Sequence, residues 1–127
     1  NTDMGKSVCE DNEHSYLEHL PRQGVLLLNS ALTTEEGVAG AHYDLWRPFI
    51  EQAVIGLNKK PHLVWVLWGK EAQKLRKLIN PIHDIVEGAH PSPFSYNPNP
   101  KTGHIGFKDQ MFFRKINALI KGPQITW

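Results

Sequence analysis

Cysteine is almost absent from this 127-residue chain, which contains only Cys9. A single cysteine excludes a framework of internal disulfides, the usual support of small secreted domains, and favours an intracellular protein. An excess of one charge is missing too, because 14 Lys and Arg residues face 13 Asp and Glu residues and leave a formal net charge of +1. Contacts with nucleic-acid phosphates must therefore be built locally rather than by a broad basic surface.

Long apolar runs are also missing, and no stretch approaches the roughly 20 residues that a membrane helix needs. The first residues are polar and contain no signal peptide, and the chain begins with Asn1 rather than methionine. We therefore expect a fragment or a processed product. Glycine-rich nucleotide loops, the hydrolase nucleophile motif and the spacings typical of zinc ligands do not occur, so we expect no cofactor and no metal.

What the sequence does contain is an alternation of apolar patterns. Short continuous apolar runs indicate strands buried on both faces, and apolar residues repeating every three or four positions indicate helices. Pro48 is expected in the first turn of its helix, where proline is tolerated. The predicted elements are a short helix near 13–20, a strand at 24–29, a helix at 44–58, a strand at 62–68, a helix at 69–79, a weaker strand at 82–89 and a helix near 108–121.

This order predicts an α/β fold, with a central parallel sheet flanked by helices, in a chain whose length suits one domain. In such folds the functional loops follow the carboxyl ends of the strands. Three positions meet that condition: Asn29, the pair Gly69-Lys70, and His90 with the loop behind it.

The loop after the last predicted strand, Ala89-His90-Pro91-Ser92-Pro93-Phe94-Ser95, is the most informative segment. Its alternating prolines restrict the backbone, so His90 and Ser92 are held at low entropic cost. Ser92 and Ser95 could offer hydroxyl and backbone N–H groups to a phosphate, and Phe94 could act as a wedge in a base stack. The structural alternative is a rigid surface loop whose Phe94 packs into the core.

The other two positions each allow a functional and a structural interpretation. The Asn29 amide has one acceptor and two donors and could read a ring that carries amide groups, or it could simply cap a strand. Gly69-Lys70 lies where a strand turns into a helix, so free N–H groups and a lysine charge could bind an anion. Alternatively, the pair forms a tight turn with a solvated lysine.

Four blocks in order, Gly24–Thr33, Leu67–Lys74, His83–Ser95 and Pro123–Trp127, resemble family 1 uracil-DNA glycosylase. The likeness covers residues 24–127, whereas residues 1–23 fit only loosely. It implies that Asn29 matches the asparagine that binds the uracil edge and rejects cytosine. It also implies that His90 matches the histidine that, as a neutral imidazole, donates to uracil O2 and stabilises the departing base.

The same resemblance implies a set of DNA contacts: phosphate binding by one turn and clamping of the strand by the proline loop. The implied DNA-binding residues are Gly69, Lys70, Ser92, Pro93, Phe94 and Ser95. Lys70 replaces the usual serine, and Phe94 replaces the leucine that usually enters the duplex. The family's Gly-Gln-Asp-Pro-Tyr-His segment, with its water-activating aspartate, is absent from these 127 residues.

We therefore interpret the chain as the C-terminal part of one glycosylase domain that hydrolyses the N-glycosidic bond of uracil in single- or double-stranded DNA. The 127 residues alone are expected to have negligible activity. We expect an intracellular protein, nuclear or mitochondrial in a eukaryote and cytoplasmic in a bacterium, that is monomeric when intact and is a target for a glycosylase inhibitor protein. The alternatives are a non-catalytic DNA-binding or inhibitor-binding module and a generic α/β ligand-binding domain.

Overall fold

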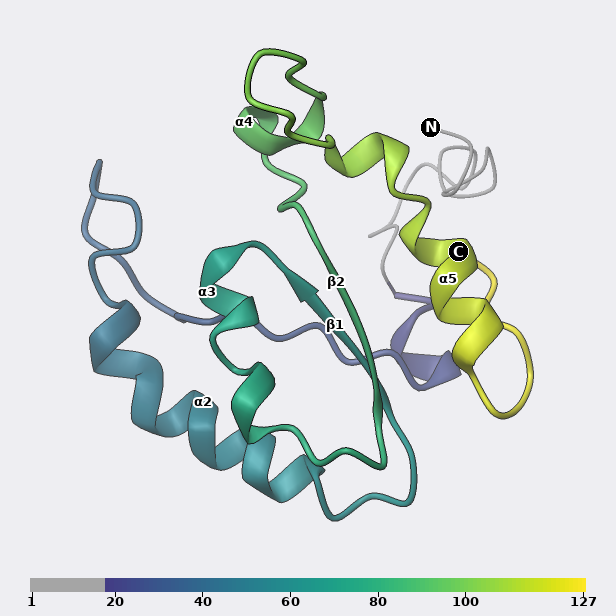
Figure 1. The fold of residues 1–127 in the computed structure, drawn as a ribbon. Coiled ribbons are helices and arrows are strands. Elements are labelled where there is room, and N and C mark those ends of the chain that lie inside the picture. Colours follow the sequence, from purple (N-terminus) through teal and green to yellow (C-terminus); the bar gives the residue numbers. More distant parts are fainter. Residues whose placement is uncertain (1–17) are drawn as a thin grey trace. The chain divides into compact units, whose positions relative to one another are not determined.

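The computed structural model describes residues 18–127, apart from the side chains of Pro93 and Phe94 (Figure 1). Cys9 and most of the helix predicted near 13–20 lie outside the described residues, and residues 18–20 form a turn. The elements are η1 (Pro21–Gln23), α2 (Tyr43–Leu57), β1 (Val64–Trp68), α3 (Lys70–Gln73), η2 (Arg76–Leu78), β2 (Asp84–Gly88), α4 (Pro93–Tyr96), η3 (Phe107–Asp109) and α5 (Phe112–Leu119).

The chain divides into two compact units. The central unit is Leu28–Glu87, and the terminal unit combines residues up to Leu27 with Gly88–Trp127. None of the helices in residues 18–127 is both long and apolar enough to cross a membrane.

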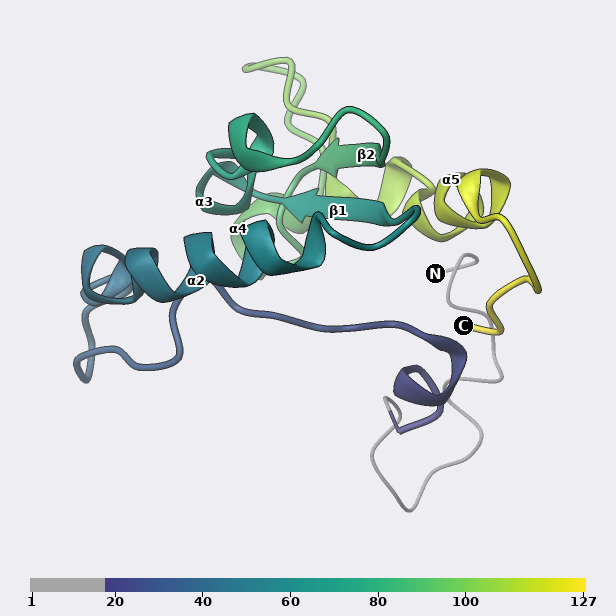
Figure 2. The same ribbon diagram turned by 90° about the horizontal axis from the view of Figure 1, so that it is seen from below.

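The central unit is built on a two-stranded sheet in which β1 pairs with β2. Both strands run in the same direction in Figure 2, as the predicted parallel sheet requires. A parallel pair needs a crossover connection, which here consists of α3 and η2. Both strands lie within their predicted ranges, so the α/β class with a parallel sheet and helices is confirmed.

Helix α2 and the crossover pack against one apolar core in this unit. Val54, Leu67 and Ile79 are its buried centre, and each comes from a different part of the unit. Trp65, which is partly buried, packs against the same cluster. The helix predicted at 44–58 is thus confirmed. Pro48, however, lies inside α2 rather than in its first turn, which costs the helix one N–H donor but does not end it.

His83 is the one buried polar side chain of the described core, with 6% exposure. The Leu63 N–H donates to His83 Nδ1 at 3.0 Å, and His83 Nε2 donates to the Asn58 carbonyl at 3.3 Å. Asn58 in turn donates from Nδ2 to the Leu78 carbonyl at 2.6 Å and accepts the Asn80 N–H at 3.0 Å. These bonds connect the end of α2, the crossover and the start of β1, so the structure assigns His83 a role in the fold.

The strand predicted at 24–29 is wrong. These residues form no strand, and Leu26, Leu27 and Leu28 are 66%, 55% and 42% exposed. An apolar run becomes a strand only where a neighbouring strand accepts its backbone hydrogen bonds. The sheet in the described residues contains only β1 and β2, and neither pairs with this run.

Two helices are shorter than predicted. The one expected at 69–79 is divided into α3 and η2, because the intervening N–H groups bond three residues back, as in Leu75 N to Ala72 O at 3.0 Å. The one expected near 108–121 is divided into η3 and α5. Met111, with φ of 53°, adopts a left-handed conformation between them, which no helix can continue through.

The terminal unit has its own apolar core. Its buried side chains are Leu20, Phe107, Phe112, Phe113 and Ile116. Two amide side chains hold the C-terminal tail as a neighbouring strand would, because each uses both its donor and its acceptor. Gln23 bonds the backbone of Thr126 at 3.0 and 2.8 Å, and Asn117 bonds that of Ile125 at 3.0 and 3.1 Å.

Candidate functional site

The loop that carries His90 begins at Gly88, the last residue of β2. A Cβ atom at Gly88 would overlap the ring of Phe112, and Phe112 is 1% exposed. Only glycine therefore fits where the strand end meets this buried ring. The close approach fixes the point from which the His90 loop leaves the core.

His90 itself is exposed, and its ring is held by the loop backbone. The N–H of Ser92 donates to His90 Nδ1 at 3.0 Å. A nitrogen that accepts a hydrogen bond carries no proton, so the proton of the neutral imidazole is on Nε2. The loop thus holds the ring of the exposed His90 as an Nε2–H donor, which is the form that the resemblance implies for its role.

The two serines of the loop offer less to a phosphate than predicted. The Ser92 N–H bonds His90, and the Ser95 N–H donates to the Ser92 carbonyl at 3.0 Å. The expected backbone contacts are thus occupied inside the loop, whereas neither hydroxyl makes a hydrogen bond within residues 18–127. The side chains of Pro93 and Phe94, in α4, lie outside the described part of the chain, so the wedge stays a prediction.

His104 holds the far side of this loop and was missed by the sequence analysis. Its Nε2 donates to the Ser95 carbonyl at 3.1 Å, and its carbonyl accepts the Asn99 N–H at 2.9 Å. Gly103, with φ of 70°, makes the turn that brings His104 back toward the loop. No chemical motif includes His104; Pro98, Pro100 and Gly103 indicate a loop and do not indicate where this histidine bonds.

In the central unit, Asn29 is exposed and follows an unpaired segment instead of a strand. The next residue, Ser30, lines a shallow depression together with Arg47 of α2 and Glu71 of α3. The segment after Asn29 and the start of α3 therefore flank the same depression. Ser30 and Glu71, the immediate neighbours of Asn29 and Lys70, line it, whereas Asn29, Gly69 and Lys70 themselves do not.

Gly69 and Lys70 form the predicted turn from strand to helix. Gly69 follows β1 directly and has φ of 87°, a conformation that favours glycine. Lys70 is exposed and makes no ion pair with the residues that the structure describes. Its charge is available to a ligand. Helix α3 has only 4 residues, so its N-terminus contributes little to the binding of an anion.

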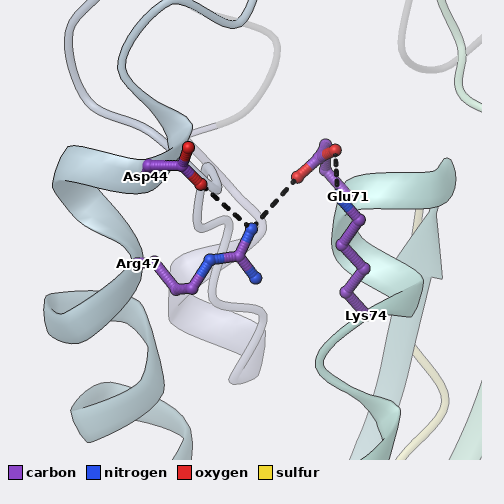
Figure 3. Close-up of polar contacts among 4 residues, drawn as sticks. All are labelled: Asp44, Arg47, Glu71 and Lys74. Atoms are coloured by element: carbon purple, nitrogen blue, oxygen red, sulfur yellow. Dashed lines mark hydrogen bonds and ion pairs between the residues drawn. The ribbon is translucent and has the colours of Figure 1, made fainter.

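Charges around the depression neutralise the carboxylate beside Lys70 (Figure 3). Arg47 lies 3.5 Å from Asp44 and 3.9 Å from Glu71, and Lys74 Nζ lies 2.6 Å from Glu71 Oε1. A free Glu71 next to Lys70 would repel a phosphate. With two cations on it, the start of α3 presents Lys70 to solvent with less opposition.

Residues 8–121 match the family model of the uracil DNA glycosylase superfamily. The chain belongs to this superfamily. The match begins before residue 24 and so includes part of the segment for which only a loose fit was expected. The four motifs lie later in the chain, and the N-terminal part of the likeness carries no motif that sequence inspection could find.

Curated relatives agree with this family. The chain is 37% identical to a uracil-DNA glycosylase of Alkaliphilus metalliredigens over 133 residues, covering all of this chain and 54% of the relative. It is 45% identical over 111 residues to a uracil-DNA glycosylase of Pseudomonas paraeruginosa, covering 85% and 45%. The chain thus spans about half the length of the curated relatives it matches.

Solved structures share the fold. Mimivirus uracil-DNA glycosylase superposes with a TM-score of 0.70 at 32% identity, covering 87% of this chain and 46% of that one. A mimivirus UNG variant in complex with UGI gives a TM-score of 0.68 at 32% identity, covering 84% of this chain and 44% of that one.

The described residues bring together no group of three or more metal-ligating side chains.

Proposed function

We propose that the full-length protein containing this chain is a family 1 uracil-DNA glycosylase that cleaves the bond between uracil and deoxyribose and leaves an abasic site. One observation carries the proposal beyond the family: Ser92 N–H occupies His90 Nδ1 and leaves Nε2–H as an exposed donor. Bond cleavage builds negative charge on the base, and a prepositioned donor at uracil O2 stabilises that charge. The exposure of His90 suits a base that has been flipped out of the duplex.

Asn29 is proposed to read the uracil edge. Its amide can donate to one ring oxygen and accept from the ring N–H, whereas cytosine presents a different order of donors and acceptors. A mismatched base leaves polar groups unpaired, which is how a hydrogen-bonding site discriminates. No side-chain hydrogen bond within residues 18–127 occupies Asn29, so the amide is available.

DNA binding is assigned to Lys70, to the hydroxyls of Ser92 and Ser95, and to Phe94 as the wedge. Flipping a base costs a few kcal/mol, which wedge insertion and phosphate contacts offset. Because lysine contributes only one charge to these contacts, their share of the salt dependence of binding should be moderate.

The water-activating aspartate is proposed to lie outside these 127 residues, which contain no Gly-Gln-Asp-Pro-Tyr-His segment. We interpret the chain as the C-terminal portion of one glycosylase domain that acts inside the cell as a monomer. The structure of mimivirus UNG with UGI supports an inhibitor protein as a second partner.

The test compares uracil release from a single-stranded oligonucleotide by the 127-residue chain and by the full-length protein. We expect negligible release by the chain alone. In the full-length protein, His90→Ala should slow the chemical step about 10²–10³-fold, as loss of an oxyanion donor does. His19→Ala, which removes an imidazole outside the loop, is the control. An effect of His90→Ala on binding alone would contradict the assigned role.

The second candidate is a module that binds DNA or an inhibitor without catalysis. That candidate predicts that the full-length protein binds uracil-containing DNA but releases no base. Release of uracil by the full-length protein decides for the enzyme.

A further inference from the structure

The segment that contains Asn29 makes no hydrogen bonds of its own within the described residues. The Val25 N–H bonds the Leu20 carbonyl at 3.1 Å, and no residue from 26 to 32 makes a hydrogen bond within the described part of the chain. The next hydrogen-bonded residue is Thr33. The placement of Asn29 in the central unit therefore depends on the anchor that follows it.

The Thr33 hydroxyl joins two groups at the start of α2. Trp46 Nε1 donates to Thr33 Oγ1 at 2.8 Å, and Thr33 Oγ1 lies 2.8 Å from His42 Nδ1. The hydroxyl accepts the indole N–H and still has its hydrogen and a second lone pair for His42 Nδ1, so it can serve either tautomer of that ring. One hydroxyl thus makes both bonds.

The anchor rests on a rigid element. His42 is the N-cap residue of α2 and Trp46 lies in its first turn, while Ile50 and Val54 of the same helix are buried. The Trp46 ring also meets Phe49 edge-on, with centroids 5.7 Å apart. Thr33 therefore ties the segment behind Asn29 to a helix that is held by the core.

We propose that Thr33 is a positioning residue for Asn29 and sets how well the site recognises uracil. This inference rests on the proposed function, since it assigns a role to the base-reading residue of that site. A segment without its own hydrogen bonds populates many conformers, and apparent affinity falls with the fraction that is competent to bind. Anchoring at Thr33 raises that fraction before the base arrives.

Thr34 supplies a matched control in the same loop. Its hydroxyl donates to the Val38 carbonyl at 2.7 Å, which closes the local turn and touches neither Trp46 nor His42. Thr33→Val and Thr34→Val make the same chemical change at adjacent positions. Thr33→Ser restores the hydroxyl without the methyl group.

The experiment has a structural arm on the 127-residue chain. We expect Thr33→Val to shift the ring ¹⁵N resonances of His42, which loses a hydrogen-bond partner at Nδ1, and to lower the backbone order parameter of Asn29 from about 0.85 toward 0.6. Thr33→Ser and Thr34→Val should resemble the unsubstituted chain. An unchanged order parameter of Asn29 in Thr33→Val overturns the proposal.

The kinetic arm uses the full-length protein and a single-stranded uracil oligonucleotide. Loss of positioning should raise KM about fivefold to tenfold with little change in kcat, because the competent fraction falls. A lower kcat at unchanged KM means that Thr33 acts only through folding, and it overturns the proposal. If the unsubstituted protein releases no uracil, the proposed function fails, and the spectra still decide whether Thr33 orders the Asn29 segment.

Discussion

Replacing Ser92 with proline isolates the hydrogen bond that directs His90. Ser92 has φ of −60° and ψ of 156°, which suit a proline at this position and a residue that precedes Pro93. The substitution removes the N–H that donates to His90 Nδ1 at 3.0 Å. Ser92→Ala removes only the hydroxyl, so the two variants separate the backbone bond from the side chain.

The size of the effect follows from the strength of that bond. A net contribution of about 0.5–1.5 kcal/mol corresponds to about a 2- to 13-fold change in the preference for the Nε2–H form. With the proton then shared between both nitrogens, the Nε2–H population falls by at most about twofold, so we expect Ser92→Pro to lower kcat up to about twofold relative to Ser92→Ala, in uracil release by the full-length protein. The ¹⁵N shifts of His90 should show the proton shared between both nitrogens.

One result would refute this role of the Ser92 N–H. If Ser92→Pro keeps the Nε2–H signature and the kcat of Ser92→Ala, the loop does not direct the imidazole through this bond. Equal denaturation midpoints of the two variants show that the comparison is made between equally folded proteins.

Three other expectations follow from the structure. His83→Ala leaves the Leu63 N–H and the Asn58 carbonyl without partners, which should cost about 1–3 kcal/mol for each group in chemical denaturation; a loss below 1 kcal/mol would contradict it. Asn29→Asp should weaken binding of uracil relative to cytosine in oligonucleotide competition, and an unchanged base preference counts against its role. Lys70→Gln should reduce the slope of log affinity against log salt by about 1, whereas an unaltered slope excludes a phosphate contact.

The two apolar runs show what a sequence pattern can and cannot predict about strands. The runs at 24–29 and 62–68 look alike as sequence, yet only the second contains a strand. The difference lies in whether another strand is present to pair with the run. Apolar pattern describes what a segment can bury and carries no information about its neighbour.

Some features of the candidate site could be predicted from the sequence, and others could not. His90 and the Gly69 turn were predictable because adjacent prolines and a glycine restrict their own backbone. The Ser92 bond to His90, the His104 bond to Ser95 and the Trp46 bond to Thr33 were not predictable. They depend on how a loop closes or on residues many positions away, and no spacing rule covers such contacts.

We expect the exposed leucines at 26–28 to affect how the purified chain behaves in solution. From Gln23 to Thr34 the sequence contains no charged residue and no proline, and backbone N–H and C=O groups at 26–29 are unpaired within the described residues. Such a segment is a template for pairing between molecules. Self-association through it would cover Asn29, so the affinity measured for a uracil-containing oligonucleotide would fall as the protein concentration rises.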